Sequence, residues 1–100
     1  MNTLNATDVC TEIKRRLRAR GCRWVSVTHG TGTAYGWIKI SAGPRRSMTD
    51  EERAELARLL GLEQVHAQGE RIPAGYDYYR EYLARAAGEP PTIHGKQYWD

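Results

Sequence analysis

Hydrophobic residues recur along this chain at two spacings, one typical of amphipathic helices and one typical of half-buried strands. Residues 5–20 follow the helical spacing and therefore predict a first helix with one buried stripe. Asn5 or Thr7 is expected to cap its N-terminus, and Gly21 can adopt the left-handed conformation that ends helices. The predicted stripe consists of Val9, Cys10, Ile13 and Leu17.

Two runs of alternating residues, 23–29 and 33–41, follow this helix and predict an antiparallel hairpin with a turn at 30–32. A hairpin alone is marginally stable in water, so its Val/Ile face is expected to pack under helices. That face holds Val25, Val27, Ala34, Gly36, Ile38 and Ile40, whereas the opposite face carries Trp24, Ser26, Thr28, Tyr35, Trp37 and Lys39.

A second helix is predicted after the hairpin. Thr49 and Glu52 have the spacing of a capping box, in which each residue bonds the backbone of the other. The helix is expected to end near residue 60, because Gly61 supplies a Schellman-type ending. Its buried residues are expected to be Leu56, Leu59 and Leu60.

The remaining chain predicts a short strand and a third helix. Val65 and Ala67 indicate a strand over residues 63–68, and a turn follows at 72–75. A third helix is expected over residues 77–87, with one face made of Tyr79, Tyr82, Leu83 and Ala86.

The order of elements is α-β-β-α-(β)-α, which predicts an α+β fold, a two-layer sandwich with the hairpin packed on helices. One hundred residues and 11.4 kDa fit a single domain. We expect that domain to span residues 1–88 and to be followed by a Pro-containing tail over residues 89–100. The mean hydropathy of −0.69 argues against a membrane protein, and no apolar run approaches the roughly 20 residues of a membrane-spanning helix.

Charge is distributed unevenly along the chain. The net charge is +3, made up of +6 over residues 1–50 and −3 over residues 51–100. Such a dipolar protein can place its basic half against nucleic acid or against an acidic protein surface. Two alternatives do not involve a partner: the basic residues can form a solvated helix surface, and the arginine excess can reflect genome composition. The basic cluster consists of Lys14, Arg15, Arg16, Arg18, Arg20, Arg23, Arg45 and Arg46.

The outer hairpin face is aromatic, and three interpretations of it stay open. Trp24, Tyr35 and Trp37, with Lys39, could stack on the bases of a single strand. Tryptophan and tyrosine also dominate protein–protein hot spots, including homodimer interfaces. The third interpretation is that the helix over residues 77–87 covers this face with its tyrosines.

The two cysteines are expected to be free thiols. A helix over residues 7–20 separates Cys10 from Cys22 by about 18 Å along its axis. This exceeds the roughly 7 Å between Cα atoms that a disulfide allows. Free thiols and the lack of a secretory leader predict a cytoplasmic location, in the cytosol of a host cell. The cysteines and histidines show no metal-ligand spacing, so no metal and no other cofactor is predicted.

The run His29-Gly30-Thr31 resembles the nicotinamide-binding signature of ADP-ribosyltransferases. The resemblance implies that Tyr35 and a distant glutamate would complete a His-Tyr-Glu set. A turn also needs glycines simply to reverse the chain, and no other nucleophile–base set is evident. We therefore expect no catalytic residues and no enzyme activity, with an ADP-ribosyltransferase-like enzyme as a marginal alternative.

Three segments, Arg23–Val27, Gly32–Ile40 and Thr49–Glu52, resemble a small domain found in large polyvalent proteins of phages and conjugative elements. The similarity covers roughly residues 5–85. It implies an origin in a mobile element, where stand-alone proteins of this size often block host defence complexes, as anti-CRISPR proteins do. The resemblance implies no particular site residues.

The sequence thus predicts a non-enzymatic protein that inhibits a host nucleic-acid-handling defence complex by covering its surface. The alternative is a nucleic-acid-binding domain that uses the basic face of the first helix. The residues expected to contact a protein partner are Trp37, Tyr35, Tyr76, Tyr78, Arg15, Arg18, Arg45 and Arg46. Those expected to contact nucleic acid in the alternative are Lys14, Arg15, Arg18, Arg23, Arg45 and Arg46.

Overall fold

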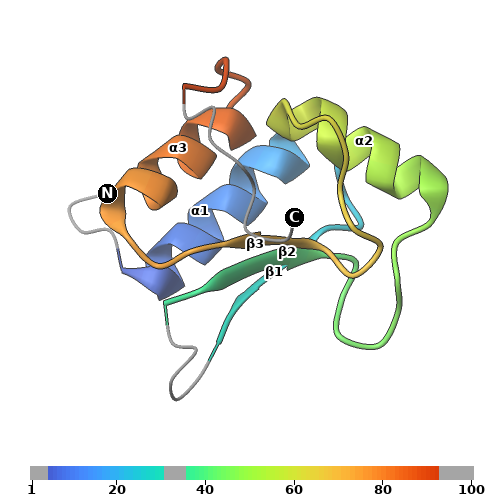
Figure 1. Cartoon of the computed structure of the whole chain (residues 1–100), viewed down its shortest axis with the longest axis horizontal. Coiled ribbons are helices and arrows are strands. Elements are labelled where there is room, and N and C mark those ends of the chain that lie inside the picture. The colour runs from blue at the N-terminus through green and yellow to red at the C-terminus, as the bar shows by residue number, and fades with distance from the viewer. Residues whose placement is uncertain (1–4, 31–35, 93–100) are drawn as a thin grey trace.

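The described part of the chain forms three helices and a three-stranded antiparallel sheet, in the order α-β-β-α-β-α (Figure 1). The computed structural model describes residues 5–30 and 36–92. The predicted α+β class and order of elements are confirmed. The elements are α1 (Ala6–Ala19), β1 (Ser26–His29), β2 (Ile38–Ser41), α2 (Asp50–Leu60), β3 (Glu70–Ile72) and α3 (Tyr76–Ala86).

Local signals set the limits of the first two helices as predicted. The Asn5 side chain caps α1 by accepting a hydrogen bond from the Asp8 backbone N–H at 2.8 Å. Thr49 and Glu52 form the capping box of α2, and Gly61 ends that helix with a φ of 68°. The four stripe residues of α1 and the three leucines of α2 are all buried.

The hairpin forms with the predicted faces, but its strands are shorter than predicted. β1 and β2 are antiparallel, with Val27 opposite Ile40 and Thr28 opposite Lys39. Ile38 and Ile40 are fully buried toward the helices. The predicted turn residues 31 and 32 and the inward Ala34 lie outside the described residues.

Trp24 does not belong to the outer hairpin face, and that expectation was wrong. The residue precedes β1, and its indole N–H donates to Glu55 of α2 at 2.8 Å. Its ring packs beside the hydrophobic core. Strand alternation does not apply to Trp24, because its backbone is not part of a strand. Its half-buried position lets the ring pack on apolar atoms while the indole N–H bonds a carboxylate.

The third strand lies later in the chain than predicted. β3 is Glu70–Ile72 and pairs antiparallel with β2, whereas residues 63–68 form no strand. Val65 is buried within that loop, which explains the apolar pattern. The apolar pattern does not predict β3, because one of its inward residues is a carboxylate: Glu70 is 1% exposed and accepts a hydrogen bond from the Tyr82 hydroxyl at 2.7 Å.

All three helices cover the same face of the sheet (Figure 1). α3 packs beside α1, and the Tyr82 hydroxyl reaches Glu70, which shares the inner face with Ile40. The Tyr79 hydroxyl donates to the Gly36 carbonyl. The interpretation that the third helix covers the outer hairpin face is therefore wrong.

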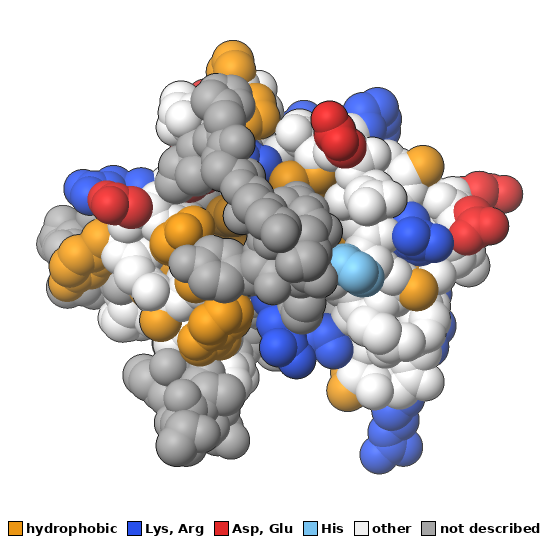
Figure 2. Space-filling view, viewed as in Figure 1, with side chains coloured by type: hydrophobic (Ala, Val, Ile, Leu, Met, Phe, Trp, Pro, Cys, Tyr) orange, Lys and Arg blue, Asp and Glu red, His pale blue; other side chains and the backbone are white. Residues whose placement is uncertain are grey.

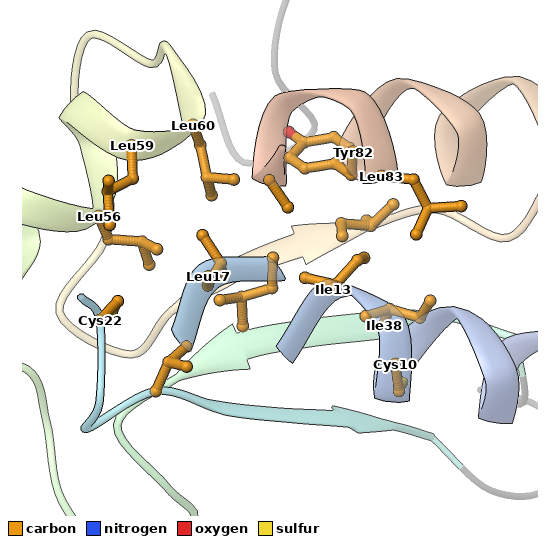
Figure 3. Close-up of a cluster of buried hydrophobic side chains, with 14 of the residues drawn as sticks. Cys10, Ile13, Leu17, Cys22, Ile38, Leu56, Leu59, Leu60, Tyr82 and Leu83 are labelled. Atoms are coloured by element: carbon orange, nitrogen blue, oxygen red, sulfur yellow. The ribbon is translucent and has the colours of Figure 1, made fainter. Parts of the chain in front are cut away.

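The core lies between the helices and the inner face of the sheet. Figure 3 shows Leu17 of α1 on the side of Leu56 and Leu60 of α2, and Ile13 of α1 below Tyr82 of α3. All but Tyr82 are at most 1% exposed. Because each helix contributes to this one cluster, the helices can bury their apolar stripes only together.

An ion pair is buried in α3. Arg85 is 6% exposed, and its Nε donates to Glu81 Oε2 at 2.8 Å. Arg85 Nη1 donates to the Leu60 carbonyl, and the Thr92 backbone N–H donates to Glu81. This pair therefore joins α3 to the end of α2 and to the first residues of the predicted tail; residues 93–100 lie outside the described residues.

We predict that both cysteines resist thiol reagents while the protein is folded. Cys10 and Cys22 are buried free thiols, as their spacing predicted. Burial raises the pKa of Cys10 to about 11 and that of Cys22 to about 12, so neither forms the reactive thiolate at pH 7. Labelling with an aromatic disulfide reagent should be negligible in native buffer and complete in urea. Rapid native labelling of a Cys10→Ser or Cys22→Ser variant would show that the remaining thiol is accessible and contradict the prediction.

Candidate binding site on the outer face of the sheet

The outer face of the sheet carries a groove, here called the sheet groove, with a volume of about 410 Å³. Its polar side chains form a row because Thr28, Lys39 and Arg71 are direct partners across the three strands. Trp37, which directly precedes β2, lines the same groove. The groove is lined by Thr28, His29, Gly30, Trp37, Ile38, Lys39 and Arg71.

The groove places two cations side by side. Lys39 lies directly opposite Arg71, and like charges at such positions repel each other. With Trp37 at one end, the groove has the chemistry to bind an anionic group that lies next to an aromatic ring.

His29 lines the groove but is the partner of the inward Ile38. Its Nε2 lies 3.4 Å from the Thr7 hydroxyl at the start of α1, and its Nδ1 lies 3.0 Å from the Gly30 carbonyl. The imidazole thus contacts α1. Thr31 and Tyr35, the other residues of the ADP-ribosyltransferase resemblance, lie outside the described residues.

The other predicted aromatic anchors are Tyr76, Tyr78 and Tyr35, and the first two belong to α3. Tyr76 is 64% exposed at the start of α3. A Cβ on Gly36 would lie 2.9 Å from the Ala74 side chain, so the chain just before α3 passes close to the chain just before β2. Tyr78 is only half-buried and packs beside the core. Tyr35 lies outside the described residues.

Several cations of the basic cluster bind carboxylates. Arg46 donates from two nitrogens to the two oxygens of Glu52 at 2.6 and 2.9 Å, and Arg15 and Arg16 both donate to Glu12. These arginines lower the pKa of each glutamate to about 2, chiefly through the hydrogen bonds. Arg15 and Arg46 can therefore reach a partner only by exchanging one anion for another.

Arg16 and Arg20 donate hydrogen bonds to backbone carbonyls near the ends of other helices and so stabilise the fold. Arg20 Nη1 donates to the carbonyls of Leu59, Arg85 and Ala86 at 2.9, 3.0 and 3.2 Å, so one guanidinium closes the ends of α2 and α3. Arg16 Nη1 donates to the Leu83 carbonyl at 2.7 Å. The charge run thus contains two residues whose role is to join helices.

The structure separates the predicted contact residues into two groups. Trp37 and Tyr76 lie at the end where α1 begins, whereas Arg18 lies toward the end of α1 and Arg45 follows the far end of β2 (Figure 1). Lysine and arginine side chains are dispersed over the face seen in Figure 2. Within the described chain, four members of the basic cluster make no side-chain hydrogen bond or ion pair: Lys14, Arg18, Arg23 and Arg45.

Sequence reasoning missed Arg71 as a site residue. The signal was present, because Arg71 is a polar residue between the inward Glu70 and Ile72, as an outward strand position should be. The apolar pattern predicts the strand over residues 63–68, and a strand there does not pair Arg71 with Lys39.

These observations define a small α+β protein with helices on one face of its sheet and a cationic, aromatic groove on the other. The chain matches no family model, no curated protein and no solved structure in the three comparisons made with it. In residues 5–30 and 36–92, no helix has the length and apolar character needed to cross a membrane. The same residues contain no group of three His, Cys, Asp or Glu side chains placed to hold a metal ion.

Proposed function

We propose that this protein acts without a reaction of its own, by docking on a protein partner and covering its surface. The observation that carries the proposal is Tyr76, a large hydrophobic side chain that is 64% exposed at the start of α3. Tyrosine and tryptophan dominate the binding energy of protein interfaces, since they bury large areas with few rotatable bonds. A mostly exposed tyrosine is suited to such an anchor.

The proposed partner is a nucleic-acid-handling defence complex in the cytosol of a host cell, as the resemblance to phage and conjugative-element domains implies. Inhibition by covering a surface needs affinity and not catalysis. Lys39 and Arg71 would meet acidic groups beside the aromatic anchors. The distant cations, Arg18 and Arg45, would increase the association rate through long-range attraction.

The second candidate function is nucleic-acid binding through α1. Lys14 and Arg18 are four residues apart on that helix and therefore lie on one face, and neither binds a carboxylate within the described chain. Two such cations can both contact phosphates of a nucleic-acid backbone.

The test measures anti-defence activity and binding together. We expect host cells with a CRISPR complex to admit a targeted phage when they express the protein, and the purified complex to bind it. Tyr76→Ala and Trp37→Ala should each weaken binding by about 30-fold or more, because a hot-spot residue contributes at least about 2 kcal/mol. Arg58→Ala, an exposed change on α2, serves as the control and should bind as the wild type does.

Two results would contradict the proposal. One is full phage exclusion together with no binding to the purified complex. The other is a dimer of this chain, detected by sedimentation, that Tyr76→Ala dissociates, because the anchor would then be the interface between two copies. Circular dichroism of each variant should match the wild type, so that lost binding reports the surface and not the fold.

A further inference from the structure

We infer that one face of α1, here called the cation face, binds the phosphate backbone of a double-stranded nucleic acid without reading its base sequence. The cation face consists of Lys14 and Arg18, and Arg23 extends it just beyond the end of the helix. The inference rests on the second candidate function, nucleic-acid binding through α1. It deepens that function by naming the class of nucleic acid and the kind of contact.

The packing of α1 against α3 leaves the cation face on the other side of the helix. Arg16 and Arg20 donate to the carbonyls of Leu83 and Arg85 at 2.7 and 3.0 Å, so α3 covers their side of α1. Lys14 precedes Arg16 by two residues, which corresponds to about 200° around a helix. The cation face is therefore turned away from α3.

The cation face runs beside β1, at the edge of the sheet. Thr7 shares this face because it precedes Lys14 by seven residues, two helical turns. Its hydroxyl lies 3.4 Å from Nε2 of His29, the last residue of β1. In the sheet formed by the described residues, β1 is paired on one side only. A long ligand can thus approach the cation face from outside the molecule.

The cations of this face are available to an external anion. Within residues 5–30 and 36–92, the side chains of Lys14, Arg18 and Arg23 make no hydrogen bond or ion pair. Arg18 and Arg23 are exposed and Lys14 is half-buried. Both carboxylates of α1 bind other groups: Glu12 accepts hydrogen bonds from two arginines, and Asp8 is bonded at the N-terminal cap.

The spacing of the cations corresponds to the phosphates of one strand. Lys14 and Arg18 are separated by four helical residues, a rise of about 6 Å. Two nucleotides of one strand rise about 7 Å along the axis of a duplex. Arg23 lies beside the last turn of α1, because the N–H of the preceding Cys22 bonds the Leu17 carbonyl at 3.0 Å. Three cations can therefore contact neighbouring phosphates.

The residue types of α1 favour a duplex over a single strand. Proteins that bind single strands stack the bases on aromatic side chains beside the cations. The helix Ala6–Ala19 contains no aromatic residue, and Trp24, which follows Arg23, is half-buried with its N–H bonded to Glu55. In a duplex the bases already stack on each other, and the backbone can be bound through its phosphates alone.

The same residue types predict binding without sequence preference. Base edges are read by hydrogen bonds in the grooves, with asparagine and glutamine among the principal readers. α1 contains neither, and the Thr11 hydroxyl donates instead to the Thr7 carbonyl at 3.1 Å. Phosphate contacts position a protein on a duplex but carry no sequence information.

The test is the fluorescence anisotropy of a short fluorescein-labelled duplex, titrated with the full chain over a salt series. Three phosphate contacts predict a slope of about −2.7 for the logarithm of the binding constant against the logarithm of salt concentration. Lys14→Gln and Arg18→Gln should each reduce the slope to about −1.8 and weaken binding about 8-fold at 0.1 M salt, whereas Arg18→Lys should change neither. Duplex DNA and duplex RNA are separate arms: binding of either supports the inference, and the tighter one identifies the source of the phosphates.

Arg80→Gln is the matched control, since it removes the same charge from an exposed arginine of α3. It should leave the affinity within about twofold of the wild type, because distant exposed charges are screened by salt. An unchanged slope in both Lys14→Gln and Arg18→Gln would overturn the inference. So would competition by polyglutamate as strong as that of unlabelled duplex, because the cation face would then accept any polyanion.

Failure of this inference is distinguishable from failure of the function on which it rests. If a single strand of the same length binds through Lys14 and Arg18 at least as tightly as the duplex, the inference is wrong and the second candidate function stands. If neither nucleic acid binds, both are wrong. Docking on a protein partner is separate, since Tyr76→Ala should weaken it and leave duplex binding unchanged.

Discussion

Replacing Arg85 by alanine is expected to lower the free energy of unfolding by about 3–5 kcal/mol, the typical cost of truncating one partner of a buried ion pair. Arg85 and Glu81 have side chains that are only 7% and 5% exposed. The substitution leaves the Glu81 carboxylate buried without its guanidinium partner and removes the donor to the Leu60 carbonyl. Equilibrium urea denaturation, followed by circular dichroism, measures the loss.

The same helix offers a matched control. Arg80 pairs with Asp77 at 3.2 Å, but these side chains are 66% and 85% exposed. Arg80→Ala should therefore cost less than about 1 kcal/mol, as exposed ion pairs do. If Arg85→Ala does not fold, the double variant Glu81→Gln/Arg85→Met should, since it removes both charges. If Arg80→Ala and Arg85→Ala lower the free energy of unfolding equally, burial does not determine how much the Arg85–Glu81 pair stabilises the protein.

Gly69→Ala is expected to be the most damaging of the glycine substitutions near the sheet. Gly69 has a φ of +121°, a region that residues with a side chain rarely adopt, and a Cβ there would lie 2.6 Å from the Ile40 carbonyl oxygen. Strain at such a conformation costs about 1–3 kcal/mol. The clash with the backbone of the central strand adds about 1–3 kcal/mol more, because that strand is paired on both sides.

Gly43 separates the two contributions. It has the same φ of +121°, but no atom lies within 4 Å of a Cβ built there. Gly43→Ala should therefore show the strain alone, about 1–3 kcal/mol. The difference between the two variants in urea denaturation then measures the close approach to Ile40. An equal loss at both positions would mean that the loop before β3 moves away from the central strand at little cost.

Gly69 also explains why the third strand was misplaced. The alternation of Val65 and Ala67 resembles a strand, yet the Met48 N–H bonds the Ala67 carbonyl across a loop, and the chain turns at Gly69 before β3 begins. β3 itself has three residues, of which Glu70 is a buried carboxylate. A pattern that equates inward with apolar misses a strand whose inward residue is satisfied by a distant hydroxyl.

The basic cluster shows that a local sequence pattern also fails to separate structural residues from residues available for binding. Along the sequence, Arg18 and Arg20 are equivalent members of one charge run. In the fold, Arg20 bonds three carbonyls that lie 39, 65 and 66 residues away, whereas Arg18 makes no side-chain hydrogen bond or ion pair with the described residues. Whether an arginine is structural or available to a partner depends on which helix ends lie within its reach.

Elements whose limits depend on neighbours a few residues apart could be predicted from the sequence alone. The caps at Asn5 and Thr49, the left-handed Gly61 and the apolar stripe of α1 are local features, and helix formation responds to them directly. The surfaces that remain for binding depend instead on how the elements pack together. The packing of Trp24 on α2, the location of all helices on one side of the sheet, and the pairing of Lys39 with Arg71 join residues more than 30 positions apart or on different elements. Such contacts form when separate apolar faces are buried together, and no local period in the sequence records which outward side chains that burial brings side by side.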